Sequence, residues 1–320
     1  MTGPPPAAGA AGVTAVVVSY NSARHLAELH DALMSGSLAP ERLLVVDNAS
    51  SDDSAAAAAA AGFEVRETGA NDGFGAACNV ALGMCDSELM LICNPDVRPS
   101  RTALEQLVAA LAENPKAAVA GAVFNRRLRA RRFSRLSGDV YRFLPFPLQH
   151  RLRRLDSEAP VRRSDGPVAV DYVIGAFMLC RAGALREVDG FDESFFLYSE
   201  EEDLCRRLGG RGWQTLLVPS VVVGHGRSAS SEGVERASMT PFRFHSLYLY
   251  YRKHHSRAYA ELARLTLAAC ITLDRRFRAL THREQLYDSS AAKAMFWSLD
   301  RVRQDHERRR AGASPAAESS

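Results

Sequence analysis

The fold class is decided by residues 13–21, which read VTAVVVSYN. The first seven of these residues are mainly apolar and β-branched, which predicts a buried strand. A turn at Tyr20 and Asn21 follows and leads into a helical pattern of leucines spaced three and four residues apart. A buried strand followed at once by an amphipathic helix is the opening unit of an α/β protein.

The same strand–helix unit recurs as far as residue 123. Strands that alternate with helices at this spacing require right-handed crossovers, so we expect a mostly parallel sheet with helices on both faces. Ligands of such sheets bind beyond the carboxyl ends of the strands. The further predicted strands are residues 43–46, 63–66, 89–93 and 117–123, and the predicted helices between them are 54–61, 75–84 and 102–111.

The regular alternation stops after residue 123. Residues 125–165 hold twelve arginines against four acids and predict a basic insertion. Residues 166–240 form a second ordered part, with helices at 181–188 and 199–208 and strands at 215–218 and 221–223. We therefore expect one α/β domain over 13–240, a C-terminal helical extension over 241–305 in which Leu262, Leu265, Ala269 and Leu273 form one apolar face, and disordered tails at 1–12 and 306–320.

Composition narrows the protein class. The chain has 320 residues, 47% of them hydrophobic and 24% charged, as in a soluble globular protein. Its net charge of +3 is too balanced for a typical nucleic-acid-binding protein, so no nucleic acid is expected as a partner. The six cysteines contain no Cys-x-x-Cys pair, which favours reduced thiols. With no signal-peptide pattern and no long apolar run, we expect a cytoplasmic protein that does not cross a bilayer.

Polar side chains follow three of the predicted strands. A carboxylate after the second strand can accept hydrogen bonds from a ribose or a base, and one after the fourth can hold a divalent cation. Alternatively, Asp47 and Asp52 only cap the helix that follows them. The residues at this predicted edge are Ser19, Tyr20 and Asn21, then Asp47 and Asn48, and then Asn94 and Asp96.

Two glycines mark the stretch NDGFGAACN at residues 71–79. It differs from a dinucleotide-binding fingerprint, because it follows the third strand and has Cys78 where a small Gly or Ala is required. Glycines before a helix still allow backbone N–H groups to approach a phosphate or a sugar. A simple tight turn is the alternative.

Four acids, from Glu200 to Asp203, follow an aromatic run that includes Phe196 and Tyr198. Acids at the start of a helix interact favourably with its dipole, so a solvated helix-capping face is one interpretation. The other is that burial beside the aromatic side chains raises the pKa of at least one carboxyl group into the range of a general base. His225, between two glycines at the end of the last strand, is accessible enough to bind a metal, although a lone histidine is usually structural.

In this order the motifs resemble glycosyltransferase family 2, and more narrowly its rhamnosyltransferase-like branch. The resemblance covers residues 13–255. One departure is Asn94, which stands where many relatives carry the first Asp of an Asp-x-Asp motif, although Asn-Pro-Asp is usual in this branch. The matching segments are Tyr20-Asn21, residues 46–52, residues 71–79, Asn94-Pro95-Asp96, residues 190–204, Gly212-Trp213 and residues 218–225.

The resemblance implies an enzyme of the GT-A fold that transfers a sugar from a nucleotide-sugar donor with inversion, helped by Mg²⁺ or Mn²⁺. It assigns residues 13–123 to donor binding and 166–240 to the acceptor and catalysis, with Asp96 and His225 as metal ligands. Glu201 takes the catalytic-base position, with Glu200 as the alternative, and Asp203 orients the site. The implied donor-binding residues are Ser19, Tyr20, Asn21, Asp47, Asn48, Asn71, Gly73, Phe74, Gly75, Asn79, Asn94 and Asp96, and the acceptor-side residues are Gly175, Ala176, Phe196 and Tyr198.

The branch further implies dTDP-L-rhamnose as donor and a polyprenyl-diphosphate-linked sugar as acceptor, in cell-envelope polysaccharide synthesis. A UDP-sugar and a soluble glycoside are the alternatives. The basic insertion and an amphipathic helix at 258–278 favour peripheral contact with the inner face of the cell membrane. The alternative is that the insertion is a solvated loop and that the helix packs on the catalytic core or on the second subunit of a homodimer.

Two other functions compete with this one. A nucleotidyltransferase would carry a Gly-rich phosphate loop with Lys or Arg after the first strand, where this chain has Ser19, Tyr20 and Asn21. A degenerate, non-catalytic sugar-binding module would need neither the base Glu201 nor a metal site.

Overall fold

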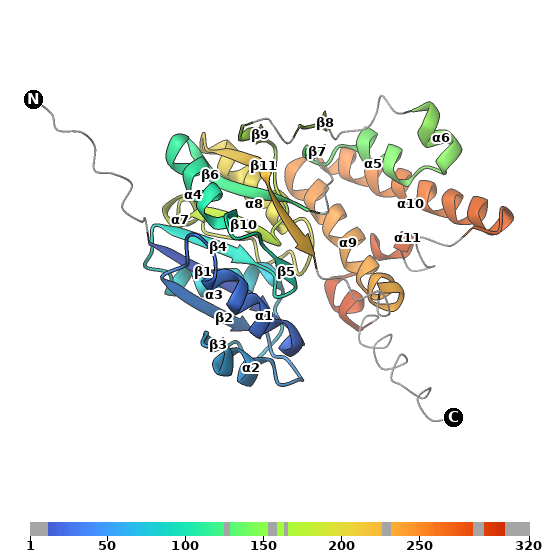
Figure 1. The fold of residues 1–320 in the computed structure, drawn as a ribbon. Helices are drawn as coiled ribbons and strands as arrows, with labels where there is room; N and C mark the ends of the chain where they lie inside the picture. The colour runs from blue at the N-terminus through green and yellow to red at the C-terminus, as the bar shows by residue number, and fades with distance from the viewer. Residues whose placement is uncertain are drawn as a thin grey trace, which may run out of the picture. The chain divides into compact units, whose positions relative to one another are not determined.

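The computed structural model describes residues 12–124, 129–152, 159–162, 166–225, 232–283 and 291–304. The predicted tails lie outside these residues, apart from Gly12. The chain divides into two compact units (Figure 1). Unit 1 is Met1–Phe133, Glu158–Ser194 and Glu200–Gly226, and unit 2 is Ser134–Ser157, Phe195–Ser199 and Arg227–Ser320.

Unit 1 is built on a nine-stranded sheet in the order β3-β2-β1-β4-β10-β6-β11-β5, with β9 paired to β11. The strands β3, β2, β1 and β4 are parallel, β10 runs antiparallel between β4 and β6, and β11 is parallel to β6. The predicted α/β fold with a mostly parallel sheet is confirmed. The strands are β1 (Val13–Ser19), β2 (Arg42–Asp47), β3 (Glu64–Glu67), β4 (Leu89–Cys93), β5 (Val97–Arg98), β6 (Ala117–Phe124), β9 (Val168–Val170), β10 (Phe177–Arg181) and β11 (Gln214–His225).

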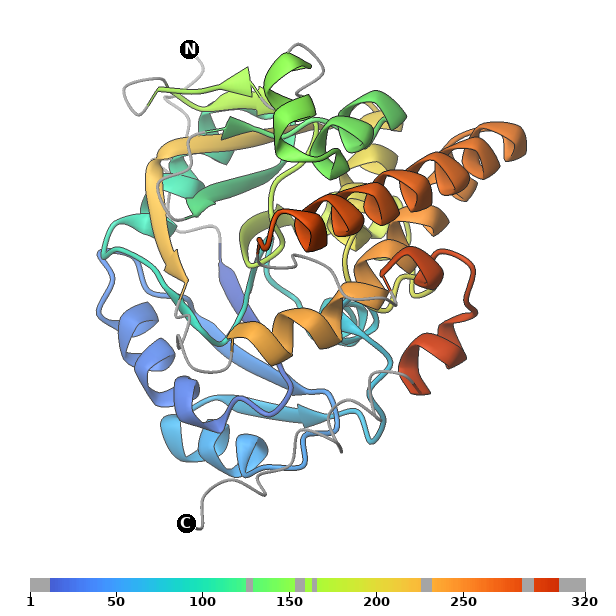
Figure 2. The same cartoon turned by 90° about the vertical axis from the view of Figure 1, so that its right-hand side faces the viewer.

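Helices cover both faces of this sheet, because successive side chains of a buried strand point to opposite faces. Helices lie on both sides of the sheet in the ribbon views (Figures 1 and 2). Val13, Ala15 and Val17 pack in one core with α1, α2 and α4, whereas Val16 and Val18 pack in the other with α3, α7 and α8. These helices are α1 (Ala23–Met34), α2 (Ser54–Ala61), α3 (Phe74–Met84), α4 (Ala103–Glu113), α7 (Ala182–Arg186) and α8 (Glu200–Gly210).

The last strand of unit 1 differs from the prediction. Residues 214–225 form the single strand β11 instead of two short strands. The register of β11 against β6 shifts between Leu217 and Val222, which brackets Pro219. Because proline has no N–H to donate to a neighbouring strand, the pairing is interrupted there while the strand itself continues.

Unit 2 is helical. Its core joins α5, which comes from the predicted basic insertion, to α9 and α10 through Phe143, Phe244, Tyr251 and Leu267. Asp139 on α5 is also buried, and its carboxylate accepts a hydrogen bond from the hydroxyl of Tyr251. The helices of unit 2 are α5 (Leu136–Phe143), α6 (Phe146–Arg151), α9 (Glu232–His254), α10 (Arg257–Leu280) and α11 (Ala291–Ala294). The short strands β7 (Arg129–Ala130) and β8 (Ala159–Pro160), which belong to unit 1, pair with each other.

The predicted apolar face of α10 is not the face that packs in this core. Leu262, Leu265 and Leu273 are 56%, 59% and 54% exposed. The helix carries a second apolar face of mostly smaller side chains, and that face is buried: Ala260, Ala263, Leu267, Cys270 and Ile271. Small side chains allow neighbouring helices to approach closely, which leaves the larger leucines outside. None of the helices in the described ranges combines the length and apolar composition needed to cross a membrane.

Candidate active site

The ends of β1 and β2 form the first part of the site. Register pairs Ser19 with Asp47, and both side chains are buried, as is that of Asn48. The Asp47 carboxylate accepts hydrogen bonds from the backbone N–H of Ser50 (2.9 Å) and from its hydroxyl (2.6 Å). Ser19 Oγ is buried and has no hydrogen-bond partner among the described residues. A buried, unsatisfied hydroxyl at a strand end is suited to a polar ligand.

The loops after β1 and β2 interlock through Asn21. Its N–H donates to Ser50 Oγ (2.9 Å), and its side-chain Oδ1 accepts from the N–H of Ser51 (2.8 Å). Asn21 has a left-handed backbone (φ 51°), a conformation that asparagine tolerates better than most residues. Its Nδ2 is buried without a partner within the described ranges, so it is a second polar atom available to a ligand.

Asp52 braces the two helices that start beside these loops. Oδ1 accepts from the N–H of Ser54 (3.1 Å), and Oδ2 accepts from the N–H of Ala23 (3.3 Å). Burial raises the pKa of Asp52, but the hydrogen bonds from Ser54 and Ala23 favour the charged form more, so the net pKa is lowered. The capping interpretation therefore describes Asp52, whereas Asp47 binds its own loop.

The turn before α3 is held from β2. Asn48 Nδ2 donates to Asn71 Oδ1 (2.9 Å) and to the carbonyl of Gly73 (3.1 Å). Gly73 has φ 102°, which favours glycine, and α3 starts at the next residue, Phe74. The predicted residues 71–74 thus lie at the same edge of the sheet as Asp47.

Asn79, further along α3, makes its hydrogen bonds to the turn at 190–193. Its Nδ2 donates to the carbonyl of Phe191 and to Glu193 Oε1 (both 2.9 Å), and its Oδ1 accepts from the N–H of Phe191 (2.8 Å). Gly75 allows α3 to approach closely, because a Cβ there would lie 3.0 Å from Phe191 Cβ. Asn79 and Gly75 connect α3 to the turn that precedes the acidic helix.

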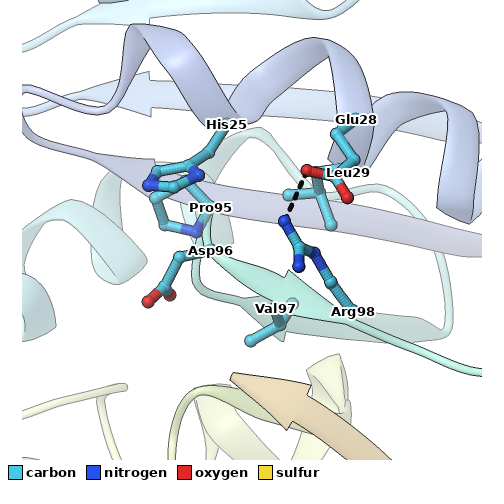
Figure 3. Close-up of a pocket in the computed structure, with 7 residues that line it drawn as sticks. All are labelled: His25, Glu28, Leu29, Pro95, Asp96, Val97 and Arg98. Carbon is cyan, nitrogen blue, oxygen red and sulfur yellow. Dashed lines mark hydrogen bonds and ion pairs between the residues drawn. The ribbon is translucent and has the colours of Figure 1, made fainter. Parts of the chain in front are cut away.

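A shallow depression at the end of β4 contains Asp96. It is lined by α1 and by residues 95–98, and Figure 3 shows the ring of His25 beside Pro95 and Asp96. Arg98 forms an ion pair with Glu28 across it (2.8 Å). Burial lowers the pKa of His25, and the charge of Arg24 lowers it further, while Asp96 opposes this. The sequence analysis missed His25; its only signal was a spacing of three and four residues from Glu28 and Leu29 on one face of α1.

Asp96 and His225 are of residue types that can ligate a divalent cation. β11 pairs with β5 so that His225 lies opposite Val97, the neighbour of Asp96 in the chain. The side chain of His225 is outside the described part of the chain, and no group of three or more His, Cys, Asp or Glu able to hold a metal occurs within that part. A carboxylate and an imidazole would supply two ligands, which leaves positions for diphosphate oxygens and water.

The acidic run starts helix α8, and its first member is deeply buried. Glu200 is 5% exposed, and its Oε2 has no hydrogen-bond partner among the described residues. Burial, and then the charge of Glu201, raise the pKa of Glu200 well above its usual range. Burial thus favours the protonated form of Glu200 over the charged form. Glu201 is half-buried, so it is the better placed of the two to accept a proton from a ligand.

Asp203 acts on the structure around this helix start. It is fully buried, and its Oδ2 accepts from Arg207 Nε (2.7 Å). Arg207 also donates to the carbonyls of Val188 (2.5 Å) and Gly190 (2.7 Å). Asp203 and Arg207 together thus link α8 to the 188–190 turn.

The predicted acceptor-side residues fall into two groups. Gly175 lies beside Glu201, because a Cβ at Gly175 would be 3.7 Å from Glu201 Cβ and 3.4 Å from the Phe74 ring. The carbonyl of buried Ala176 accepts from the N–H of Asn94 (2.9 Å), which ties this loop to the end of β4. The structure thus brings Gly175, Ala176, Phe74, Asn94 and Glu201 into one unit.

Phe196 and Tyr198 belong to unit 2. The ring of Phe196 stacks on Phe242 (centroids 4.7 Å apart), with the Arg303 guanidinium 4.6 Å from its centre. Tyr198 and Ser199 both have left-handed backbones, with φ 70° and 64°. Two such residues in a row before α8 store backbone strain of the kind that clusters at functional sites.

A sequence model described as Glycosyl transferase family 2 matches residues 14–188, which is more than half of the chain. The chain belongs to glycosyl transferase family 2. It is accordingly an enzyme, and the predicted membership and GT-A type of fold are confirmed.

Curated members of the family extend the comparison. Over 285 residues the chain is 29% identical to the N-acetylglucosaminyl-diphospho-decaprenol L-rhamnosyltransferase of Mycobacterium tuberculosis, covering 81% of this chain and 90% of that protein. It is 30% identical to the pre-mycofactocin glycosyltransferase of the same species over 69% of this chain and 44% of that protein. A short segment, 16% of the chain and 19% of the relative, is 43% identical to rhamnosyltransferase WbbL of Escherichia coli.

Solved structures of glycosyltransferases share the fold. The mannosyltransferase PcManGT of Pyrobaculum calidifontis, in complex with GDP-Man and Mn²⁺, matches with a TM-score of 0.58 and 17% identity, covering 93% of this chain and 84% of that one. Glucosyl-3-phosphoglycerate synthase of Mycobacterium tuberculosis, with Mn²⁺, UDP-Glc and phosphoglyceric acid, matches with a TM-score of 0.51 and 16% identity over 75% of this chain and 79% of that one.

Proposed function

We propose that this family 2 enzyme transfers L-rhamnose from dTDP-L-rhamnose to a hydroxyl of a polyprenyl-diphosphate-linked sugar in cell-envelope polysaccharide synthesis, with inversion and with a divalent cation. The observation that carries the proposal is the match to the mycobacterial N-acetylglucosaminyl-diphospho-decaprenol L-rhamnosyltransferase, which extends over 90% of that relative. An acceptor of this kind is anchored in a bilayer, so the proposal includes contact with the cytoplasmic face of the membrane.

The proposed step is a single displacement. The acceptor hydroxyl attacks the anomeric carbon, its proton passes to the Glu201 carboxylate, and the bond from that carbon to the diphosphate oxygen breaks. Glu201 is half-buried, whereas Glu200 beside it is buried, and that burial raises the pKa of Glu200 well above its usual range. Desolvation disfavours the charged form of Glu200, and this supports Glu201 over Glu200 as the base.

The donor would bind along the edge formed by β1, β2 and β4. Ser19 Oγ and Asn21 Nδ2 are the unsatisfied polar atoms at the nucleoside end, and Asp47 has a preformed loop around it. Asp96 and His225 would hold the cation, whose chemistry is to neutralise the charge that develops on the departing diphosphate. Asn94, tied to Ala176, positions the segment that carries Asp96.

A second candidate is a UDP-sugar transferred to a soluble acceptor. It rests on the match to the pre-mycofactocin glycosyltransferase, of which this chain covers 44%. The shared fold of the GDP-Man and UDP-Glc complexes does not choose among nucleotides.

Thermal-shift measurements test the donor. Purified protein is heated with dTDP-rhamnose, UDP-glucose, UDP-galactose, UDP-GlcNAc or GDP-mannose, each with and without Mg²⁺ or Mn²⁺, since a ligand that binds only the folded state raises the melting temperature. We expect a metal-dependent rise with dTDP-rhamnose that Ser19→Ala reduces. A rise with a UDP-sugar alone would select the second candidate, and no rise with any donor would favour the non-catalytic binding module.

A further inference from the structure

Helix α10 carries a line of exposed apolar side chains along its whole length. We call it the leucine stripe; its members are Ala258, Leu262, Leu265, Ala269, Leu273 and Leu280. At 100° per residue these positions fall within an arc of about 80°, and at 1.5 Å per residue they extend about 33 Å along the helix. Leu280, at the end, is 82% exposed. Figure 2 shows α10 along its length, as the long orange-red helix of the upper right.

This stripe is an unusual surface for a soluble helix. The side of α10 opposite the unit 2 core should carry charged residues, as in an ordinary amphipathic helix. Instead, three leucines more than half exposed lie one turn or two apart on it. Aligned large apolar side chains on one exposed face mark an interaction surface, whereas singly scattered ones do not.

The exposed charged residues around the leucine stripe are arginines. Arg257 precedes it, Arg276 lies within its arc near the C-terminal end, and Arg283 follows the helix, and all three are exposed. Both acids of α10 form ion pairs within the helix: Glu261 with Arg264, and Asp274 with Arg278 (2.7 Å). Asp274 is buried. The face therefore presents leucines with one arginine, Arg276, in the same arc, while Arg257 lies beside the stripe at its N-terminal end and Arg283 follows it in the chain.

This distribution disfavours a second copy of the chain as the cover for the stripe. In an antiparallel pairing of two α10 helices, Arg257 of one copy would meet the region of Arg276 of the other. In a parallel pairing, each Arg276 would meet its equivalent. Either arrangement brings like charges together beside an apolar contact, which is destabilising. An anionic bilayer surface, by contrast, attracts these arginines and takes up the leucines.

We propose that the leucine stripe of α10 docks on an anionic membrane surface, with the helix axis parallel to the bilayer. The leucines enter the boundary between headgroups and acyl chains, and Arg257, Arg276 and Arg283 contact lipid phosphates. The aliphatic stem of Arg276 can lie along the apolar surface while its guanidinium reaches the headgroups. This inference rests on the membrane contact of the proposed function and names the surface that makes it, but vesicle binding is measured without a donor, so it can fail while the transfer reaction stands.

Vesicle co-sedimentation tests the proposal with the full-length protein. The vesicles are phosphatidylcholine alone or phosphatidylcholine with about 30% phosphatidylglycerol, at low and high salt. The test variant is the triple substitution L262Q/L265Q/L273Q. The matched controls are Met34→Gln on α1 and Leu148→Gln on α6, which remove apolar side chains that are 45% and 42% exposed elsewhere. Circular dichroism melts show that each variant is folded.

We expect binding to the anionic vesicles that weakens at high salt, at least about tenfold weaker partitioning of the triple variant, and no change in the controls. Arg257→Gln with Arg276→Gln should reduce binding to anionic vesicles only. Should the triple variant melt early, the single substitution Leu265→Gln with a smaller loss serves the same purpose.

Absence of binding by the wild type at low salt, or equal binding by the triple variant, would overturn the proposal. Analytical ultracentrifugation without vesicles tests whether a second copy of the chain covers the stripe instead. A wild-type dimer that the triple substitution converts to a monomer, without vesicle binding by either, would assign the stripe to a second copy.

Discussion

The end of β2 and the start of α8 both place carboxylates in unit 1, but they treat these groups in opposite ways. Asp47 is buried with hydrogen bonds to each oxygen, both from Ser50. Glu200 is equally buried, yet its Oε2 has no partner among the described residues. The first carboxylate has its hydrogen bonds satisfied, whereas the second is deprived of solvent, which raises the pKa of Glu200 well above its usual range.

The difference separates residues that stabilise the fold from residues at the site of the proposed chemical step. A hydrogen-bonded loop around Asp47 is a rigid, preformed edge that a nucleoside can bind without rearrangement. A desolvated acid beside Glu201 is unfavourable for folding, but it lies next to the carboxylate that we propose accepts the proton of the acceptor hydroxyl. Substitutions in the first kind of region should reduce stability, and substitutions in the second should reduce turnover.

The largest effect is expected from Glu201→Gln. The amide cannot accept the proton of the acceptor hydroxyl, so kcat should fall by at least about 100-fold. Donor binding and melting temperature should stay close to wild type, because Glu201 is not part of a core. Steady-state kinetics with dTDP-rhamnose, together with donor titrations, measure both quantities.

Glu200→Gln is the control for that variant. It preserves the shape of the side chain and replaces a carboxyl group whose uncharged form is favoured by burial, so activity should change little. Loss of turnover in Glu200→Gln with near-normal activity in Glu201→Gln would reverse the roles of the two acids and remove the basis of the comparison.

An intermediate effect is expected from Asn79→Ala. This substitution removes three hydrogen bonds between α3 and the turn at 191–193. The loss should lower the free energy of unfolding by about 2 kcal/mol, with unchanged affinity for the donor below the melting transition. Chemical denaturation and isothermal titration measure the two. A variant of normal stability with weakened donor binding would show instead that Asn79 contacts the nucleotide sugar.

The smallest effect concerns pH. The folded-state pKa of Glu200 lies above its unfolded value, so its contribution to stability is fully present below the unfolded pKa and is lost as pH rises through the folded one. Relative to Glu200→Gln, wild-type stability should fall as pH rises from the unfolded pKa toward the folded one, by at most about 1.4 kcal/mol per pH unit. Denaturation curves of both proteins at several pH values check this. Parallel pH dependence in the two would mean that Glu200 is ionised.

Local sequence determined the elements of this protein. Ser54–Ala61 is a helix and Leu89–Cys93 a strand at the predicted bounds, because an alanine run and an apolar run each have a strong preference that neighbours do not oppose. Strand ends in a parallel sheet share one edge, so Ser19 and Asp47 could be expected side by side before any coordinates were available. The motifs from Tyr20 to His225 also indicated the family.

Only the tertiary structure decided which groups are buried and what they bind. Residues 112 apart in the chain, Asn79 and Phe191, form hydrogen bonds that no local pattern encodes. His25 lies in the Asp96 depression because α1 packs beside β5. On α10, two apolar faces compete, and contact with α5 and α9 selects the one with smaller side chains. Periodicity shows that a helix has an apolar face, but the choice among faces depends on the shape of the partner it packs against.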